Sequence, residues 1–177
     1  MGERDERDGL SADTPRSASA FGPEFPVAFG APMALAPGCA MGERELRQIL
    51  DATSEGVYCS DAAGRIVFMN APGARLLGYD AAKLSGADAH STFHHHTADG
   101  APYAACDCPI HQTLTDGRSR RVDSETFFRK DGTSIPVEYS AAPLYGASGE
   151  VAGCVVCFHD ITDRRRTEEE RRALLAR

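Results

Sequence analysis

Arg-Lys-Asp-Gly-Thr, at residues 129 to 133, is the stretch of sequence that decides the fold. It joins two extended runs rich in Val, Thr, Phe and Tyr, at residues 121 to 129 and 135 to 141, and its Asp131-Gly132 dipeptide tolerates positive φ in a tight hairpin. A third extended run, at residues 151 to 158, follows a short loop. The pattern predicts three antiparallel strands at hairpin spacing.

The first half of the periodic sequence predicts one amphipathic helix, two strands and three short helices. Leu46, Ile49 and Leu50 fall at i, i+3 and i+4, which places one apolar stripe on a helix that begins near Glu43. Asn70 has the chemistry of a helix N-cap. The remaining elements are strands at residues 56 to 60 and 65 to 70 and helices at residues 71 to 77, 80 to 84 and 107 to 114. This order predicts an α+β fold, a five-stranded antiparallel sheet with short helices on one face.

Length and composition predict one folded domain with two flanking segments. Nearly all the periodic apolar signal lies in roughly 115 residues from Leu46 onward, which is enough for one core. Residues 1 to 42 are rich in Ala, Pro and Gly without periodicity and are expected to form a disordered leader. The domain is expected at residues 43 to 162. Residues 163 to 177 are good helix formers and predict the start of a C-terminal helix.

Several function classes are disfavoured by composition. The net charge is −7 and the Arg residues are interspersed with Glu and Asp, so no nucleic-acid surface is expected. No run reaches the length of about 18 apolar residues that spans a bilayer. Six cysteines without a secretion signal predict a reducing, cytoplasmic location. No paired nucleophile and base or Gly-rich phosphate loop appears, so the chain is not expected to be an enzyme.

Several short motifs stand in a fixed order along the chain. They are Glu55-Gly56-Val57, Asp61 to Gly64 with Ile66, Phe68 and Asn70, Leu77-Gly78-Tyr79, Leu84-Ser85-Gly86, Arg129 to Gly132, and Asp160-Ile161-Thr162. Together, in this order and at these separations, they resemble the PAS sensor domain across roughly residues 46 to 162. His94-His95, Asp99 to Tyr103 and Cys108 to Ile110 also resemble a subgroup of PAS sensors.

The resemblance implies a signal-input module of the kind found in bacterial sensor histidine kinases and diguanylate cyclases. Such domains bind a small ligand or cofactor between the sheet and the short helices, or act without one, and pass a change through the last strand into a following helix. Asp160 and Thr162 are then the signal exit. The implied partners are a second copy of the chain in a homodimer and a kinase or cyclase output, fused or separate, as in two-component systems. A cofactor-free dimerisation module remains the alternative.

His and Cys are dense between residues 90 and 111, in the zone where the family's ligand-facing helices lie. Seven imidazoles and thiols fall within 22 residues, at positions 90, 94, 95, 96, 106, 108 and 111. Such donors can bind zinc, iron or haem. The candidate metal ligands are His94, His95, Cys108 and His111. The candidate cofactor-binding residues are His94, His95, Cys106, Cys108, His111, Phe128 and Phe158. Structural packing and a redox-active thiol remain as alternatives.

The cofactor options narrow by comparison with the family. Flavin photosensors carry an Asn-Cys-Arg-Phe motif that the corresponding residues 86 to 93 lack, so a blue-light flavin adduct is not expected, although flavin remains an option beside haem and a metal. Haem-binding relatives supply an axial His near the position of Cys106 in this chain. Haem therefore remains an option only if Cys106, Cys108 or His111 replaces the axial His of the family. Pro109 suits the first position of a helix, which makes Cys108 the expected N-cap. There the helix dipole favours a thiolate, so a low pKa and high reactivity are expected of Cys108.

Overall fold

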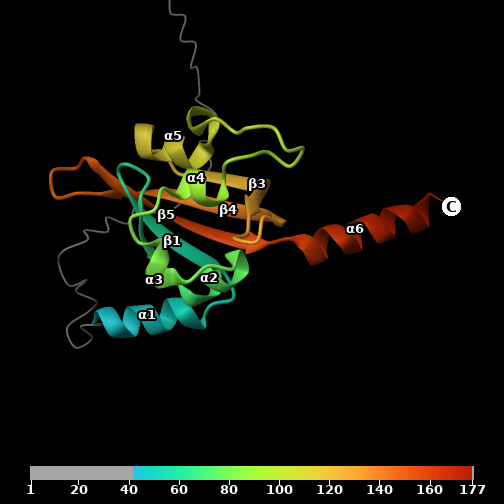
Figure 1. Cartoon of the computed structure of the whole chain (residues 1–177), viewed down its shortest axis with the longest axis horizontal. Helices are drawn as coiled ribbons and strands as arrows, with labels where there is room; N and C mark the ends of the chain where they lie inside the picture. The colour runs from blue at the N-terminus through green and yellow to red at the C-terminus, as the bar shows by residue number, and fades with distance from the viewer. Residues whose placement is uncertain (1–41, 177) are drawn as a thin grey trace, which may run out of the picture.

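The structure is a computed structural model that describes residues 42 to 176. The leader predicted for residues 1 to 42 therefore lies, except for Gly42, outside the described residues. The described chain forms a five-stranded antiparallel sheet in the order β2-β1-β5-β4-β3 (Figure 1). The strands are β1 (Gly56–Asp61), β2 (Ile66–Met69), β3 (Arg120–Phe128), β4 (Ser134–Tyr145) and β5 (Val151–Asp160). The predicted α+β fold is confirmed.

The helices fill the connection between β2 and β3 and flank the sheet at both ends. They are α1 (Glu43–Ala52), α2 (Ala71–Leu77), α3 (Ala81–Leu84), α4 (Ala89–Phe93), η1 (Ala105–Asp107), α5 (Pro109–Asp116) and α6 (Thr162–Leu175). Helices α2 to α5 cover one face of the sheet, and α6 extends away from the domain (Figure 1). No described helix is long and apolar enough to cross a membrane.

Strand β4 is longer than the sequence predicts. Its expected end was residue 141, but pairing with β5 continues through Pro143 opposite Cys154 and Leu144 opposite Gly153. A proline lacks an N–H and normally argues against a central strand. Here the pairing of β4 with β5 continues on both sides of Pro143. The extension is therefore specified by tertiary pairing, which the local sequence Ala-Ala-Pro does not indicate.

Asn70 joins α1, β1 and α2 and confirms the predicted N-cap. Its Oδ1 accepts hydrogen bonds from the backbone N–H groups of Val57, at 2.8 Å, and Gly73, at 2.9 Å. Its Nδ2 donates to the carbonyl oxygens of Leu50, at 2.8 Å, and Glu55, at 2.9 Å. The side chain is 1% exposed. Because every polar atom of the amide is paired, this buried group stabilises the start of the domain.

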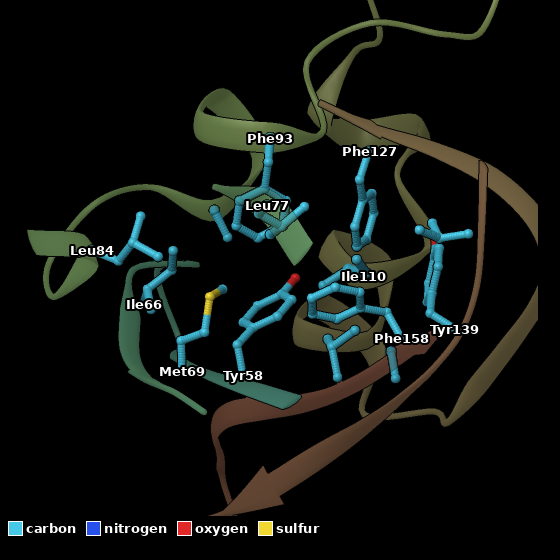
Figure 2. Packing of buried hydrophobic residues seen from close by; sticks show 14 of the residues in the cluster. Tyr58, Ile66, Met69, Leu77, Leu84, Phe93, Ile110, Phe127, Tyr139 and Phe158 are labelled. Carbon is cyan, nitrogen blue, oxygen red and sulfur yellow. The ribbon is translucent and has the colours of Figure 1, made fainter. Parts of the chain in front are cut away.

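The core lies between the sheet and the helices and is rich in aromatic rings (Figure 2). Phe127 of β3 packs with its ring centroid 5.2 Å from Phe93, 5.4 Å from Phe158 and 5.6 Å from Tyr139. On β5, the alternate residues Cys154, Val156 and Phe158 are buried, whereas Val155 and Cys157 are only half-buried. Phe158 and Cys154 therefore point into the core.

Candidate functional site

Helix α4 positions two histidines of the candidate site. Its N-cap, Asp88, accepts a hydrogen bond from the backbone N–H of Ser91 at 2.7 Å. His90 lies in the first turn, and His94 follows it by four residues at the C-cap, where its N–H donates to the His90 carbonyl oxygen at 2.9 Å. Residues four apart share one side of a helix, so both imidazoles come from one side of α4. His94 is 1% exposed and His90 is half-buried.

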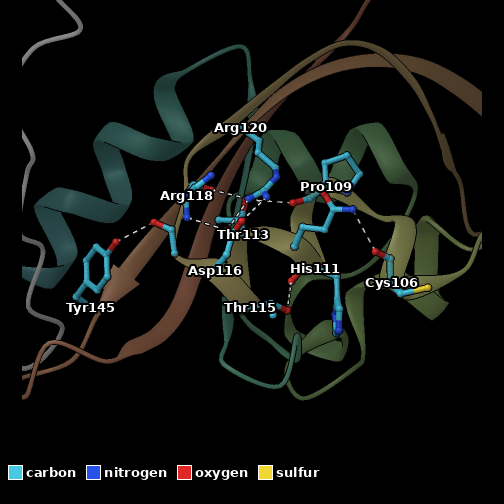
Figure 3. Close-up of polar contacts among 11 residues, drawn as sticks. Cys106, Pro109, His111, Thr113, Thr115, Asp116, Arg118, Arg120 and Tyr145 are labelled. Carbon is cyan, nitrogen blue, oxygen red and sulfur yellow. Dashed lines mark hydrogen bonds and ion pairs between the residues drawn. The ribbon is translucent and has the colours of Figure 1, made fainter. Parts of the chain in front are cut away.

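Helix α5 positions the third group, the thiol of Cys108. Cys108 is the N-cap and Pro109 the first helical residue, as the sequence predicts. Polar contacts fix the far end of α5, where Arg120 forms an ion pair with Asp116 at 2.6 Å (Figure 3). The hydroxyl of Tyr145 also donates to the carbonyl oxygen of the C-cap Gly117 at 2.9 Å. The Cys108 side chain makes no capping bond.

The three side chains converge below the helices. Sγ of Cys108 lies 3.3 Å from Nδ1 of His94. One ligand atom each from His90, His94 and Cys108 lies within 4.8 Å of the others. A cavity of about 20 Å³ adjoins the group, and Tyr58, Ile110 and His111 are among its lining residues. A cavity needs roughly 10–15 Å³ to hold one water. The space beside the cluster therefore suits a water or an ion, whereas a haem or flavin would require the surrounding side chains to move apart.

Oxygen acceptors lie against the outer nitrogens of both imidazoles. Nε2 of His90 lies 2.8 Å from the carbonyl oxygen of Tyr103, which can only accept, so Nε2 carries the hydrogen. The buried Nδ1 of His90 has no hydrogen-bond partner. Nε2 of His94 lies 3.2 Å from Oε2 of Glu125, within ion-pair distance, although its N–H is not aligned for a hydrogen bond. Nδ1 of His90 is therefore unpartnered, and Nδ1 of His94 has the Cys108 thiol as its neighbour.

The electrostatics of Cys108 differ from the sequence-based expectation. Burial raises the pKa of this thiol, and the backbone N–H groups of His111 and Ile110 at the helix start lower it by less. The thiol is 2% exposed. The expected low pKa was wrong, because the sequence shows the helix N-terminus but not the burial that outweighs it. A reactive, redox-sensing Cys108 is correspondingly disfavoured.

The carboxyl of Glu125 remains charged in a half-buried position. Burial alone would raise its pKa, but the contact with His94 and the hydrogen bond from Tyr139 lower the pKa overall. The Tyr139 hydroxyl donates to Oε2 of Glu125 at 2.5 Å. Burial, with the hydrogen bond to Glu125, raises the pKa of Tyr139 well above its ordinary value. The site thus holds a negative charge beside His94, and the tyrosine stays protonated.

The other residues predicted for this site lie apart from the cluster. His95 stacks on Phe128 with ring centroids 4.7 Å apart, and its Nδ1 lies 2.5 Å from Nδ1 of His96. Cys106 is exposed, with Sγ 3.8 Å from Oδ1 of Asp107. His111 lines the cavity but is exposed and outside the three-residue group. Of the expected ligand set of His94, His95, Cys108 and His111, the structure brings together His94 and Cys108 and places His95 and His111 outside their group.

His90, Glu125 and Phe127 also belong to the site, although they are not among the residues predicted from the sequence. His90 has the clearest signal, since its spacing of four from His94 puts two donors on one side of a helix. Phe127, rather than the predicted Phe128, is buried against His94, with ring centroids 5.0 Å apart. An irregularity in the pairing of β3 between Val122 and Glu125 changes the alternation, and no sequence signal indicated it. Phe158, a predicted cofactor-binding residue, lies in the core.

The predicted signal exit joins β5 to α6. Oδ1 of Asp160 accepts a hydrogen bond from the backbone N–H of Thr162 at 2.8 Å. Between them, Ile161 is 2% exposed and its N–H donates to the carbonyl oxygen of Pro136 at 3.0 Å. In the first turn of α6, Arg164 forms an ion pair with Glu138 of β4 at 2.8 Å. The start of α6 is therefore fixed to the sheet.

Comparison with known proteins decides the family. Residues 54 to 163 match the family described as PAS domain. The chain belongs to this family. The PAS domain match covers β1 to the start of α6, which is the whole sheet and the helices over it.

The chain is also similar to individual known proteins, with sequence identities between 20% and 27%. It is 27% identical over 124 residues to the probable diguanylate cyclase DgcE of Escherichia coli, which covers 70% of this chain but only 11% of that protein. Its fold is similar to an RNA-binding light-oxygen-voltage receptor, with a TM-score of 0.63, 20% identity and coverage of 86% of this chain and 42% of that one. It is also similar to the PAS domain of an HTR-like protein from Haloarcula marismortui, with a TM-score of 0.52, 20% identity and coverage of 67% and 90%. At these identities the solved structures support the fold alone.

Proposed function

We propose that this PAS domain is the sensory module of a signalling protein and that it transmits a change in its core through Asp160-Ile161-Thr162 into α6. The observation that carries the proposal is the course of β5. Its buried residues Val156 and Phe158 contribute to the core, and the strand continues directly into the fixed start of α6. A displacement of β5 in the core therefore reaches the helix without an intervening loop.

Helix α6 has the form of a lever. Its first turn is tied to the sheet, where Arg164 pairs with Glu138 and Arg165 donates to the hydroxyl of Ser124, and the described residues of the helix are all exposed. A helix of 14 residues is about 21 Å long, so a tilt of roughly 10° at its start moves its far end by about 4 Å. A small change in the exit geometry is thus amplified for a following partner.

A chimaera with the E. coli cyclase tests the exit. The chain replaces the 124-residue segment that it matches in DgcE, and one to seven residues are inserted after Leu175. If α6 is a rigid transmitter, cyclase activity should rise and fall with the helical period of about 3.6 residues. Asp160→Ala should weaken this dependence, because Thr162 loses the acceptor that fixes the exit angle, whereas Asp163→Ala should preserve it. Activity that does not depend on the insertion length would contradict the proposal.

Self-association remains the second candidate function, as a dimerisation module or as part of the sensor. Leu46 and Ile49 of α1 are 42% and 52% exposed, and nearby β2 exposes Val67 at 55%. Single exposed apolar residues are common, but Leu46 and Ile49 lie three residues apart on one side of α1, where a second copy could cover them. Sedimentation of the full chain should give a dimer at tens of micromolar, and the variant with Leu46→Asp and Ile49→Asp should sediment as a monomer. A monomeric parent would exclude a stable homodimer.

A further inference from the structure

We infer that His90, His94 and Cys108 form a binding site for one divalent transition-metal ion of the zinc class. The ligand atoms assigned are Nδ1 of His90, Nδ1 of His94 and Sγ of Cys108. Two imidazoles and a thiolate suit zinc and its neighbours, whereas magnesium and calcium require oxygen donors. The site differs from the set predicted from sequence, because it includes His90 and omits His95 and His111.

The geometry is close to what such an ion requires. In a tetrahedral site with Zn–N of about 2.0 Å and Zn–S of about 2.3 Å, neighbouring ligand atoms lie roughly 3.3–3.8 Å apart. The Cys108 Sγ to His94 Nδ1 distance of 3.3 Å is already in this range. One possible ligand atom from each of the three residues lies within 4.8 Å of the others, so side-chain rotations are sufficient to bring the three groups around one ion.

The surroundings match those of a metal-binding histidine pair. Such histidines usually direct the second ring nitrogen to a carbonyl or carboxylate, which fixes the ring and raises its basicity. Here Nε2 of His90 donates to the Tyr103 carbonyl oxygen, and Nε2 of His94 lies 3.2 Å from Glu125. The buried Nδ1 of His90 would otherwise remain without a partner, which is costly in an apolar core. An ion satisfies it.

Charge also balances in the occupied site. On binding, the Cys108 thiol releases its proton to solvent and becomes a thiolate, and both imidazoles remain neutral. The thiolate and the Glu125 carboxylate then offset the two positive charges of the ion. Three protein ligands leave a fourth position, and the adjoining cavity of about 20 Å³ is large enough for one water there. The inference does not depend on the signalling proposal, because binding is measured on the chain alone.

The test is a titration of the full chain, freed of metal by a chelator and kept reduced, with Co²⁺ and then Zn²⁺. We expect one Co²⁺ per chain, with a thiolate-to-cobalt charge-transfer absorption that Zn²⁺ abolishes by displacement. His90→Ala and Cys108→Ser should each weaken binding by more than about 100-fold, beyond the loss typical of outer-shell changes. His90 is half-buried and serine is close in size to cysteine, so both variants should fold, which thermal melting verifies.

The chain offers matched controls for both donor types. His96→Ala and Cys106→Ser remove an imidazole and a thiol from the same segment but outside the cluster, so both should keep the affinity and the absorption of the parent. Less than stoichiometric binding in the parent would overturn the inference. So would unchanged affinity in folded His90→Ala and Cys108→Ser, or loss of binding in either control, which would place the ion elsewhere.

Discussion

Two sets of the same residue types lie side by side in this domain and have opposite environments. His90, His94 and Cys108 point into the space beneath α4 and α5, whereas His95, His96 and Cys106 lie toward the outside, on Phe128 or at the surface. Neighbours in sequence, such as His94 and His95, thus differ completely in chemistry. The difference arises because α4 ends at His94 and α5 begins after Cys108, so the helix ends determine which donors turn inward.

The adjacent pair Phe127 and Phe128 should show this contrast most strongly. Phe127 is fully buried among Phe93, Tyr139 and Phe158, so Phe127→Ala removes a core ring and leaves a cavity, at a cost of about 3–5 kcal/mol in the free energy of unfolding. Phe128 is half-buried and mainly stacks on His95, so Phe128→Ala should cost about 1 kcal/mol. Urea unfolding of both variants measures the difference. Equal losses would mean that the inward and outward faces of β3 are assigned incorrectly.

The two thiols beside α5 should differ next most. Cys106 is exposed, while Cys108 is 2% exposed and burial raises its pKa. Alkylation of Cys108 then requires local opening, and an opening free energy of about 3 kcal/mol slows the reaction roughly 100-fold relative to Cys106. Mass spectrometry after timed labelling at neutral pH gives both rates, with Cys106→Ser as the control for assignment. If Cys108 reacts first, its thiol is accessible, and the group of His90, His94 and Cys108 is open to solvent.

The sequence was sufficient for the five strands and for several helix starts, because these depend on local patterns, but it did not predict α4 or the full length of β4. Asp131-Gly132, the N-cap Asn70 and the N-cap Cys108 with Pro109 each specify a turn or a helix start through a few neighbouring residues, and the structure has all three. Which residues belong to the site was harder to predict from the sequence. His95 and Phe128 were predicted as site residues although they lie outside the cluster, because the inward direction depends on packing that no local pattern encodes.

Burial was the main quantity that the sequence could not supply. At Cys108 the local rule, a lowered pKa at a helix N-terminus, gave the wrong direction because desolvation is the larger effect. Glu125 was overlooked for the same reason, since an isolated Glu in an exposed-looking strand gives no sign that it contacts His94. The spacing of four residues between His90 and His94 becomes informative only when a helix is known to lie there, and the sequence did not predict α4.

The smallest effect should come from the ion pair at the outer end of α5. The hydrogen bond from Arg120 and its charge hold the pKa of Asp116 well below the ordinary value. A carboxyl with a lowered folded-state pKa stabilises the fold above its unfolded pKa of about 4 and loses this contribution as the pH falls further. Asp116→Asn should therefore lower the melting temperature slightly at neutral pH, and the difference from the parent should shrink below about pH 4 and in high salt. The matched control is Asp123→Asn, because Asp123 lies 3.6 Å from Arg121 with its side chain 87% exposed, and its melting temperature should stay close to that of the parent. A larger loss for Asp123→Asn than for Asp116→Asn would show that this pair does not help to hold the helix that carries Cys108.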